Sequence, residues 1–423
     1  PGLPEAFDII TLHGVLSWVS EENRRHITDF IAARLAAGGM VYVSYNALPG
    51  WAAAVPLRRI MADRAATAQG PLEDRIGAAL AFADQLQQAG AGYFAANPAL
   101  ENRLSKLAGQ NRSYLAHEYF NRDWTPFHFA DVAQELSAAK LAFAAAADPL
   151  DHVADFKLSP EQRALLDGES DPVAREGLRD ILVNEQFRSD VFVRGLRPHT
   201  ERGKVGAWFE TRLALSRRYS GAPVKLSSRL GGTEVPAEHC APVLDALAQG
   251  PATVRSLLEA GVFGTREWGA ITRMLLLLAG AGFITPCLPA EGQETRAERC
   301  RRFNLAVCKQ AEDSAALGFL ASPVTGNGVA LDRFEQLFLL ARSEGHETPE
   351  DWAALAWRIL APQGQRLEQD GRVLETAEEN LAVLRARAMA FAATRLPVRE
   401  MLCLTLEDPR AGASHTKAAR DAA

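Results

Sequence analysis

The chain has 423 residues, of which 48% are hydrophobic and 23% charged, so its composition excludes a disordered or fibrous protein and leaves room for roughly two to four domains. Its net charge of −6 has the wrong sign for a protein that wraps nucleic acid with its whole surface. The longest apolar stretch, Met274 to Thr285, is shorter than the roughly 18 residues of a membrane-spanning helix. No basic residue precedes Arg24 and no signal-like apolar run begins the chain, so we expect a soluble, cytoplasmic protein.

The cysteines are odd in number and include no C-x-x-C pair. This pattern predicts reduced thiols rather than disulfides, a zinc site or a redox motif. His346, Glu347 and Glu350 lie close in sequence but lack the spacing of two helical metal ligands. We therefore expect no metal.

Two short apolar segments flank an amphipathic one at the start of the chain. Phe7 to Leu12 and Met40 to Ser44 are typical of buried strands. Between them, Ser20 is a candidate N-cap for a helix whose apolar residues recur until Gly38-Gly39. The pattern predicts a βαβ unit with two parallel strands. Ligands bind outside the carboxyl ends of such strands, which here are followed by residues 13–18 and 45–51.

This unit resembles a known family. Phe7 to Ile10, His13 to Val19 and Ala37 to Trp51 are similar to the fourth and fifth strands of class I S-adenosylmethionine-dependent methyltransferases that carry a methyltransferase regulatory domain. Two further blocks, His117 to Phe127 and Leu182 to Gly195, resemble the regulatory region itself. Bacterial protein-lysine methyltransferases are relatives of this kind. The resemblance implies S-adenosylmethionine as cofactor and a protein substrate, and it weakens after about residue 290.

The fold class expected is α/β plus mostly α, with the C-terminal half of a class I methyltransferase sheet. The parts expected, in chain order, are a partial methyltransferase core with strands four and five (1–52), a helical insertion (53–116), a regulatory region with strands six and seven (117–196), a basic connecting segment (197–235), a winged-helix-like domain (236–290), a helical C-terminal domain (291–410) and a tail (411–423). The insertion is placed to act as a lid or as the contact of a homodimer.

Strands six and seven are expected at Lys140 to Ala147 and Val191 to Val193. Residues 172–187 predict a helix that begins after Asp171-Pro172. Its apolar residues on one stripe are Leu178, Ile181, Leu182 and Phe187.

The glycine-rich cofactor loop of this family has no counterpart here. The glycine clusters at Leu230 to Glu234 and at Gly326 to Gly328 neither follow a buried strand nor open a helix in a βαβ context. The chain is therefore expected to be N-terminally incomplete relative to the family, with one sheet edge unpaired. Either the missing half lies on sequence outside these residues, or this chain has lost cofactor binding.

Methyl transfer to an amine requires an in-line approach and an unprotonated nitrogen. Tyr45 and Asn46 end the fifth strand, so we predict that they orient the amine as catalytic residues; the alternative is a purely structural role. His13 and Gly14 are predicted to contact the cofactor, although a histidine at a strand end is commonly just hydrogen-bonded.

An aromatic slot suits a lysine stem and its ammonium group. The substrate-binding residues predicted on this basis are Trp18, Trp51, Tyr119 and Trp124, with Glu118 and Asp123 receiving the charge of the lysine. The alternatives are domain packing for the aromatic residues and capping of the helix near Phe129 for the two acids.

The segment from Arg188 to Arg229 is basic, with ten Lys or Arg residues against three acidic ones. It predicts a docking face for an acidic protein or simply a solvated surface. Ala237 to Cys287 then shows three helices and a strand, a pattern typical of a winged helix. Residues 236–287 carry three Arg against four acidic residues, which favours an interaction module and disfavours nucleic acid as a partner.

Helices are predicted at 331–341, 349–360 and 376–394, with a turn at Asp370-Gly371 and a mobile tail from Asp408.

The leading functional hypothesis is a methyltransferase that acts on protein lysine. The alternative is a non-catalytic fragment that serves as a dimerisation and substrate-recognition module. A winged-helix DNA-binding regulator is a third hypothesis, which the local charge disfavours.

Overall fold

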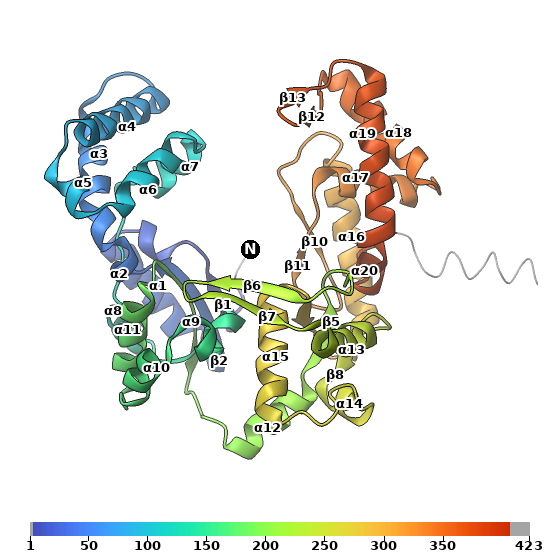
Figure 1. Ribbon diagram of the computed structural model, residues 1–423, viewed down its shortest axis with the longest axis horizontal. Coiled ribbons are helices and arrows are strands. Elements are labelled where there is room, and N and C mark those ends of the chain that lie inside the picture. The colour runs from blue at the N-terminus through green and yellow to red at the C-terminus, as the bar shows by residue number, and fades with distance from the viewer. Residues whose placement is uncertain (1–2, 407–423) are drawn as a thin grey trace, which may run out of the picture. The chain divides into compact units, whose positions relative to one another are not determined.

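Figure 1 shows the computed structural model of the protein, which describes residues 3–406. Contacts group the chain into two compact units. The first takes the residues up to 198 together with 228–231, and the second takes 199–227 together with the residues from 232 onward. No helix between residues 3 and 406 has both the length and the apolar character needed to cross a membrane.

A four-stranded sheet forms the centre of the first unit. The strands lie in the order β1 (Phe7–Leu12), β2 (Leu35–Asn46), β4 (Phe187–Arg194) and β3 (Leu141–Ala146). β1 and β2 are parallel, whereas β4 is antiparallel to both β2 and β3. The predicted parallel pair is therefore confirmed, and the strands expected as four, five, seven and six are adjacent in that order.

The connection between β1 and β2 is α1 (Glu21–Arg34). Ser20 Oγ accepts a hydrogen bond from the Asn23 N–H, which satisfies one of the free donors of the first turn, as the sequence predicts. The predicted start of β2 at Met40 was wrong. α1 ends earlier, and Leu35 is already extended, with φ −77° and ψ 131°. Gly38 and Gly39 fall where the register with β1 is irregular.

The helix α11 (Pro172–Val183) begins at Asp171, whose carboxylate accepts two backbone N–H groups. It ends sooner than predicted, because Asn184 adopts the left-handed conformation with φ 50°. Phe187 therefore belongs to β4 rather than to the helix. Ile181 is 61% exposed and does not share the buried stripe. The first difference follows from a helix stop that lacks the usual glycine, whereas Ile181 lies inside α11 on its exposed face.

β1 forms an edge of the sheet and, within residues 3–406, pairs with β2 alone. Ile9 on β1 is 56% exposed and Met40 on β2 is 41% exposed. The unpaired edge expected from the sequence is therefore present in the described part of the chain. The opposite face of β2 is covered, because Val41, Val43 and Tyr45 lie fully buried in one apolar cluster. That cluster also contains Ile31 of α1, Phe192 of β4 and apolar residues of α8 (Phe129–Ser137).

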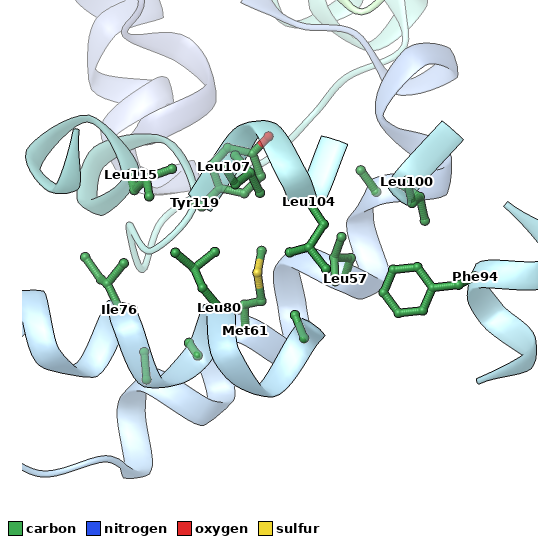
Figure 2. Packing of buried hydrophobic residues seen from close by; sticks show 14 of the residues in the cluster. Leu57, Met61, Ile76, Leu80, Phe94, Leu100, Leu104, Leu107, Leu115 and Tyr119 are labelled. Atoms are coloured by element: carbon green, nitrogen blue, oxygen red, sulfur yellow. The ribbon is translucent and has the colours of Figure 1, made fainter. Parts of the chain in front are cut away.

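A helical region between β2 and β3 has a core of its own. Its elements are α2 (Leu48–Trp51), α3 (Val55–Thr67), α4 (Leu72–Gln88), α5 (Gly92–Ala96), α6 (Ala99–Ala108) and α7 (Arg112–Glu118). α4 buries Ile76, Ala79, Leu80 and Ala83, which share one helical face. Figure 2 shows this face against Met61, Leu104 and Leu115 from α3, α6 and α7.

Short helices follow β3 before α11. They are η3 (Pro149–His152), α9 (Ala154–Lys157) and α10 (Pro160–Asp167). Leu158, Leu166 and Val183 form a small core with α11.

The second unit contains the three helices and the strand that the sequence predicts for residues 236–290. These elements are α13 (Ala237–Leu247), α14 (Val254–Glu259), α15 (Trp268–Gly280) and β9 (Ile284–Pro286). The sheet that joins them has the order β8 (Ala252–Thr253), β5 (Arg212–Leu215), β9. Its middle strand, β5, comes from the segment predicted to be a connection. That segment also contains α12 (Glu201–Glu210), β6 (Val224–Ser228) and β7 (Gly231–Val235).

The rest of the second unit is mainly helical. The elements are α16 (Gln293–Gln310), β10 (Phe319–Ala321), β11 (Gly328–Ala330), α17 (Arg333–Ser343), α18 (Pro349–Leu360), η4 (Ala361–Gln363), β12 (Glu368–Gln369), β13 (Arg372–Val373), α19 (Ala377–Ala390), η5 (Phe391–Arg395) and α20 (Leu396–Met401). The predicted turn at Asp370-Gly371 joins β12 to β13, with positive φ at both residues. The tail predicted at 411–423 lies outside the described residues.

Candidate functional site

The carboxyl ends of β1 and β2 meet in the first unit. Gly14 follows β1 with φ +62°, and its N–H donates to Ser44 Oγ on β2 at 2.9 Å. His13 Nδ1 lies 3.5 Å from the same oxygen and 3.2 Å from the Tyr42 hydroxyl. Because parallel strands end at one edge, the sequence predicts this meeting of the two loops, and the hydrogen bonds confirm it.

Two other segments are held against the end of β2. The first is the 3-10 helix η1 (Leu16–Trp18), which contains Ser17. Ser17 Oγ accepts a hydrogen bond from the Asn46 N–H at 2.9 Å. The Thr125 N–H donates to the Ser17 carbonyl at 2.8 Å, and the Phe127 N–H donates to the Asn46 carbonyl at 2.9 Å. The loop after α7 is thereby fixed beside both strand ends.

An acidic side chain and an aromatic stack lie at this point. Asn46 Nδ2 donates to Glu118 Oε1 at 3.4 Å. Trp18 stacks on His117 with ring centroids 5.3 Å apart and planes 18° from parallel. Glu118 is partly buried, and this burial raises the pKa of its carboxyl, while the Asn46 hydrogen bond and His117 act in the opposite direction. We call Trp18, Ser44, Asn46, His117 and Glu118 the strand-end group.

Tyr45 does not join this group. Side chains alternate along a strand, so Tyr45 lies on the opposite face of β2 from its neighbours Ser44 and Asn46. Its hydroxyl is fully buried and donates to Asp190 Oδ2 at 2.7 Å. Burial raises the pKa of Tyr45 well above its ordinary value, with Asp190 as the next cause. The geometry gives this tyrosine no access to a substrate, which corresponds to the structural alternative left open by the sequence.

Tyr45 belongs to a buried network, the Arg188 cluster, which comprises Tyr45, Glu176, Asp180, Arg188 and Asp190. The Arg188 guanidinium donates two hydrogen bonds to the Asp190 carboxylate, at 2.8 and 2.9 Å. It also donates to Asp180 at 2.5 Å and to Glu176 at 2.8 Å. One cation thus faces three carboxyl groups in a site where Arg188 is 4% exposed. Burial is the main reason that the pKa of Asp180 rises to about 6.

The other three aromatic residues predicted to bind substrate pack against one another. Trp51 is 2% exposed and lies 5.6 Å from Tyr119 and 5.0 Å from Trp124, measured between ring centroids. The Arg103 guanidinium lies over Trp51 at 4.6 Å, and that of Arg58 lies over Trp124 at 4.8 Å. Trp51 and Tyr119 are part of the helical core, and Trp124 packs against it. These three residues therefore attach the helical region to the loop that follows Glu118.

The capping role considered for Glu118 and Asp123 was wrong. The N-cap of α8 is His128, and its side chain makes no capping hydrogen bond. Asp123 forms an ion pair with its neighbour Arg122 at 3.2 Å. The structure therefore brings Trp18, Asn46 and Glu118 together and places Asp123 in a separate, exposed pair.

Sequence reasoning missed four polar residues at this site, namely Ser17, Ser44, His117 and Asn121. Asn121 Nδ2 donates to the Trp18 carbonyl at 3.4 Å. Period-two alternation along β2 gives the signal for Ser44, because it places Ser44 and Asn46 on one face and Tyr45 on the other. No local pattern predicts the hydrogen bond between the Asn46 N–H and Ser17 Oγ, because the two residues lie 29 positions apart in the sequence.

A family model described as a predicted methyltransferase regulatory domain matches residues 111–194. These residues include β3 and β4, so the matched region supplies half of the four-stranded sheet.

Two sequence relatives and a solved structure are also similar to this chain. The uncharacterised protein sll1526 of Synechocystis is 38% identical over 94% of this chain and 77% of its own length. The uncharacterised protein RP789 of Rickettsia prowazekii is 28% identical over 43% of this chain and 33% of its own length. The structure of PKMT2 from Rickettsia typhi in complex with AdoHcy has a similar fold, with a TM-score of 0.62, 17% identity and coverage of 95% of this chain and 81% of that chain. The chain belongs to the same family as sll1526, and its residues 111–194 form a predicted methyltransferase regulatory domain.

Proposed function

We propose that this chain takes part in methyl transfer from S-adenosylmethionine to a protein, with the amine of a lysine side chain as the acceptor. The family supports methyl transfer, and the fold shared with PKMT2 in complex with AdoHcy supports the cofactor. The observation that carries the proposal is the contact between Asn46 and Glu118 beside the Trp18–His117 stack, at the carboxyl ends of two parallel strands.

The residues at the strand ends fit one side of a cofactor site. The Trp18 indole Nε1 is buried and has no hydrogen-bond partner among residues 3–406, a property that it shares with the indoles of Trp51 and Trp124, so it remains available as a donor to a bound molecule. Gly14 has φ +62°, and a Cβ built there would be in ordinary van der Waals contact with Trp18 at 3.9 Å, so the turn brings its backbone close to the Trp18 ring. We therefore propose His13 and Gly14 as cofactor contacts. When bound, the cofactor supplies a methyl group on a positively charged sulfur.

Glu118 is the side chain proposed to meet the acceptor. Its partly buried carboxylate attracts a lysine ammonium, and its raised pKa makes it a better proton acceptor than an ordinary carboxylate. The acceptor nitrogen gives up one proton as it takes the methyl group. Trp18 offers a ring face for the alkyl stem. Asn46 is 2% exposed, so its proposed role is to position Glu118 through the 3.4 Å hydrogen bond.

The alternative function is recognition without catalysis, in which the chain contributes a dimerisation and substrate-binding module. It is favoured by one feature: within residues 3–406, no strand of the four-stranded sheet is followed by a glycine-rich loop that opens a helix, as the cofactor loop of the family does. The helical region at 53–116 is the part proposed to carry self-association.

Two measurements on this chain test the proposal. Calorimetry with S-adenosylmethionine is expected to show micromolar binding, whereas the recognition module alone is expected to release no heat. Label transfer from tritiated S-adenosylmethionine to an array of lysine-containing peptides is expected to disappear when arginine replaces the lysine. Asn46→Ala is expected to lower the transfer about tenfold, because a loosely held carboxylate meets the amine less often. Equal labelling of lysine and arginine peptides would contradict lysine as the acceptor.

A further inference from the structure

A hollow of about 250 Å³ lies in the second unit, between the end of β7, the start of α13 and one face of α15. Its floor is apolar, since Val235, Met274 and Leu277 are 4%, 5% and 0% exposed. The volume is below the roughly 300–1,000 Å³ of sites that enclose a whole small ligand. The hollow is therefore sized for a single side chain of a larger partner.

The rim of the hollow is basic. His239, Arg266 and Arg273 line it, with Glu234 as the acidic member. The Arg266 guanidinium is held in place, because it donates to the Phe263 carbonyl at 2.8 Å and to the Glu238 carbonyl at 3.5 Å. Glu234 lies 3.8 Å from the Lys225 ammonium, which offsets its charge. An apolar floor beside the fixed Arg266 guanidinium is complementary to an apolar side chain with a carboxylate next to it.

We propose that this hollow binds a peptide segment of the protein substrate in which an apolar side chain lies next to Asp or Glu. The inference rests on the proposed function, because it assigns the second unit to substrate recognition away from the methyl acceptor. Nucleic acid fits the hollow less well. Duplex DNA presents phosphates that need a broad basic surface, whereas residues 236–287 carry three Arg against four acidic residues.

Ala270 provides the test variant. It lines the hollow and is exposed on α15, so a larger side chain there occupies the hollow without entering the core. Ala270→Trp is the blocking variant, and Ala270→Ser is the matched control at the same position. Thermal unfolding of both variants is expected to stay close to that of the parent chain, because substitutions at exposed positions have small effects on stability.

The probe is a peptide array in which two adjacent central residues run through all pairs of the twenty amino acids between glycine-serine flanks. The parent chain, applied without cofactor, is expected to retain apolar–acidic pairs about tenfold more strongly than apolar–amide pairs, since a charge-assisted contact distinguishes them. Ala270→Trp is expected to lose this preference and Ala270→Ser to keep it.

Three outcomes would overturn the proposal: equal retention of acidic and amide pairs, an unchanged preference in Ala270→Trp, or salt-dependent binding of duplex DNA with no peptide retained. The array does not depend on methyl transfer. A chain that retains acidic peptides but transfers no methyl group would therefore contradict the proposed function and leave the docking site standing.

Discussion

The two faces of β2 carry two polar groups with opposite properties. On one face, the Arg188 cluster is closed: Tyr45 is fully buried, Arg188 is 4% exposed, and every member is hydrogen-bonded to another, with Asp180 Oδ2 as the one buried oxygen of the cluster that lacks a partner among residues 3–406. On the other face, Glu118 is partly buried and is held by one long hydrogen bond from Asn46. The first arrangement holds β4 and α11 to the strand, whereas the second leaves a carboxylate able to meet another molecule.

The difference shows that neighbouring residues of one strand serve different purposes. Buried charges are retained when each has a partner, and removing one partner leaves the others uncompensated. A carboxylate with a raised pKa and one weak partner contributes little to stability, so its position is better explained by binding or catalysis. Substitutions on the two faces should therefore separate stability from activity.

The largest effect is expected for Arg188→Met. Removing the guanidinium leaves Asp180 and Asp190 buried without their cation, which should lower the free energy of unfolding by about 3–5 kcal/mol. Urea unfolding followed by circular dichroism measures this change. Arg59→Met is the matched control, because it removes an exposed ion pair with Asp63 at 2.8 Å and should leave stability unchanged. Equal effects of the two substitutions would mean that burial of the cluster is not the source of its stability.

A smaller effect is expected from pH. The pKa of Asp180 is about 6 in the folded chain, against an ordinary value of 3.8. Between these values the folded chain binds the proton more tightly than the unfolded chain, so Asp180 makes the free energy of unfolding fall as pH rises from about 4 to about 6. Relative to Asp180→Asn, the parent chain should lose on the order of 2 kcal/mol over this interval, since one pKa unit is worth about 1.4 kcal/mol. Parallel urea-unfolding curves for the two chains across this range would exclude Asp180 as the titrating group.

The smallest effect on stability is expected at the strand-end group. Glu118→Gln removes a charge that burial disfavours, so it should raise the free energy of unfolding or change it by less than about 0.5 kcal/mol. Differential scanning calorimetry at pH 7 measures the change. A large loss of stability would place Glu118 with the Arg188 cluster as a structural residue.

Much of the first unit could be predicted from local signals. The apolar run at Phe7–Leu12, the cap at Ser20 and the cap at Asp171 all lie where the structure has them. The two strand ends also meet as parallel strands require. These features depend on residues close in sequence or on a general rule for parallel strands.

Other features depend on contacts that no local pattern encodes. Arg188 opens a basic segment that was expected to form a docking face for an acidic protein or a solvated surface. It is buried instead, because three carboxyl groups from α11 and β4 converge on it. Likewise, the sequence predicts that the residues of β5 belong to a connecting segment, but in the structure β5 is the middle strand of a sheet, between β8 and β9. Tyr45 and Asn46 are adjacent on β2, so alternation along the strand places their side chains on opposite faces, and only Asn46 contacts Glu118.

The central claim is that Glu118, rather than Tyr45, serves methyl transfer. The most direct test compares kcat/KM for methyl transfer to a lysine peptide in Glu118→Gln and Tyr45→Phe, each corrected for its folded fraction. We expect Glu118→Gln to lose about 100-fold, as for a general base. Tyr45→Phe should stay within about threefold while losing about 1–3 kcal/mol of stability, because the buried Asp190 carboxylate loses a donor. Full activity in Glu118→Gln together with a large loss in Tyr45→Phe would contradict the account, as would the absence of methyl transfer by the parent chain.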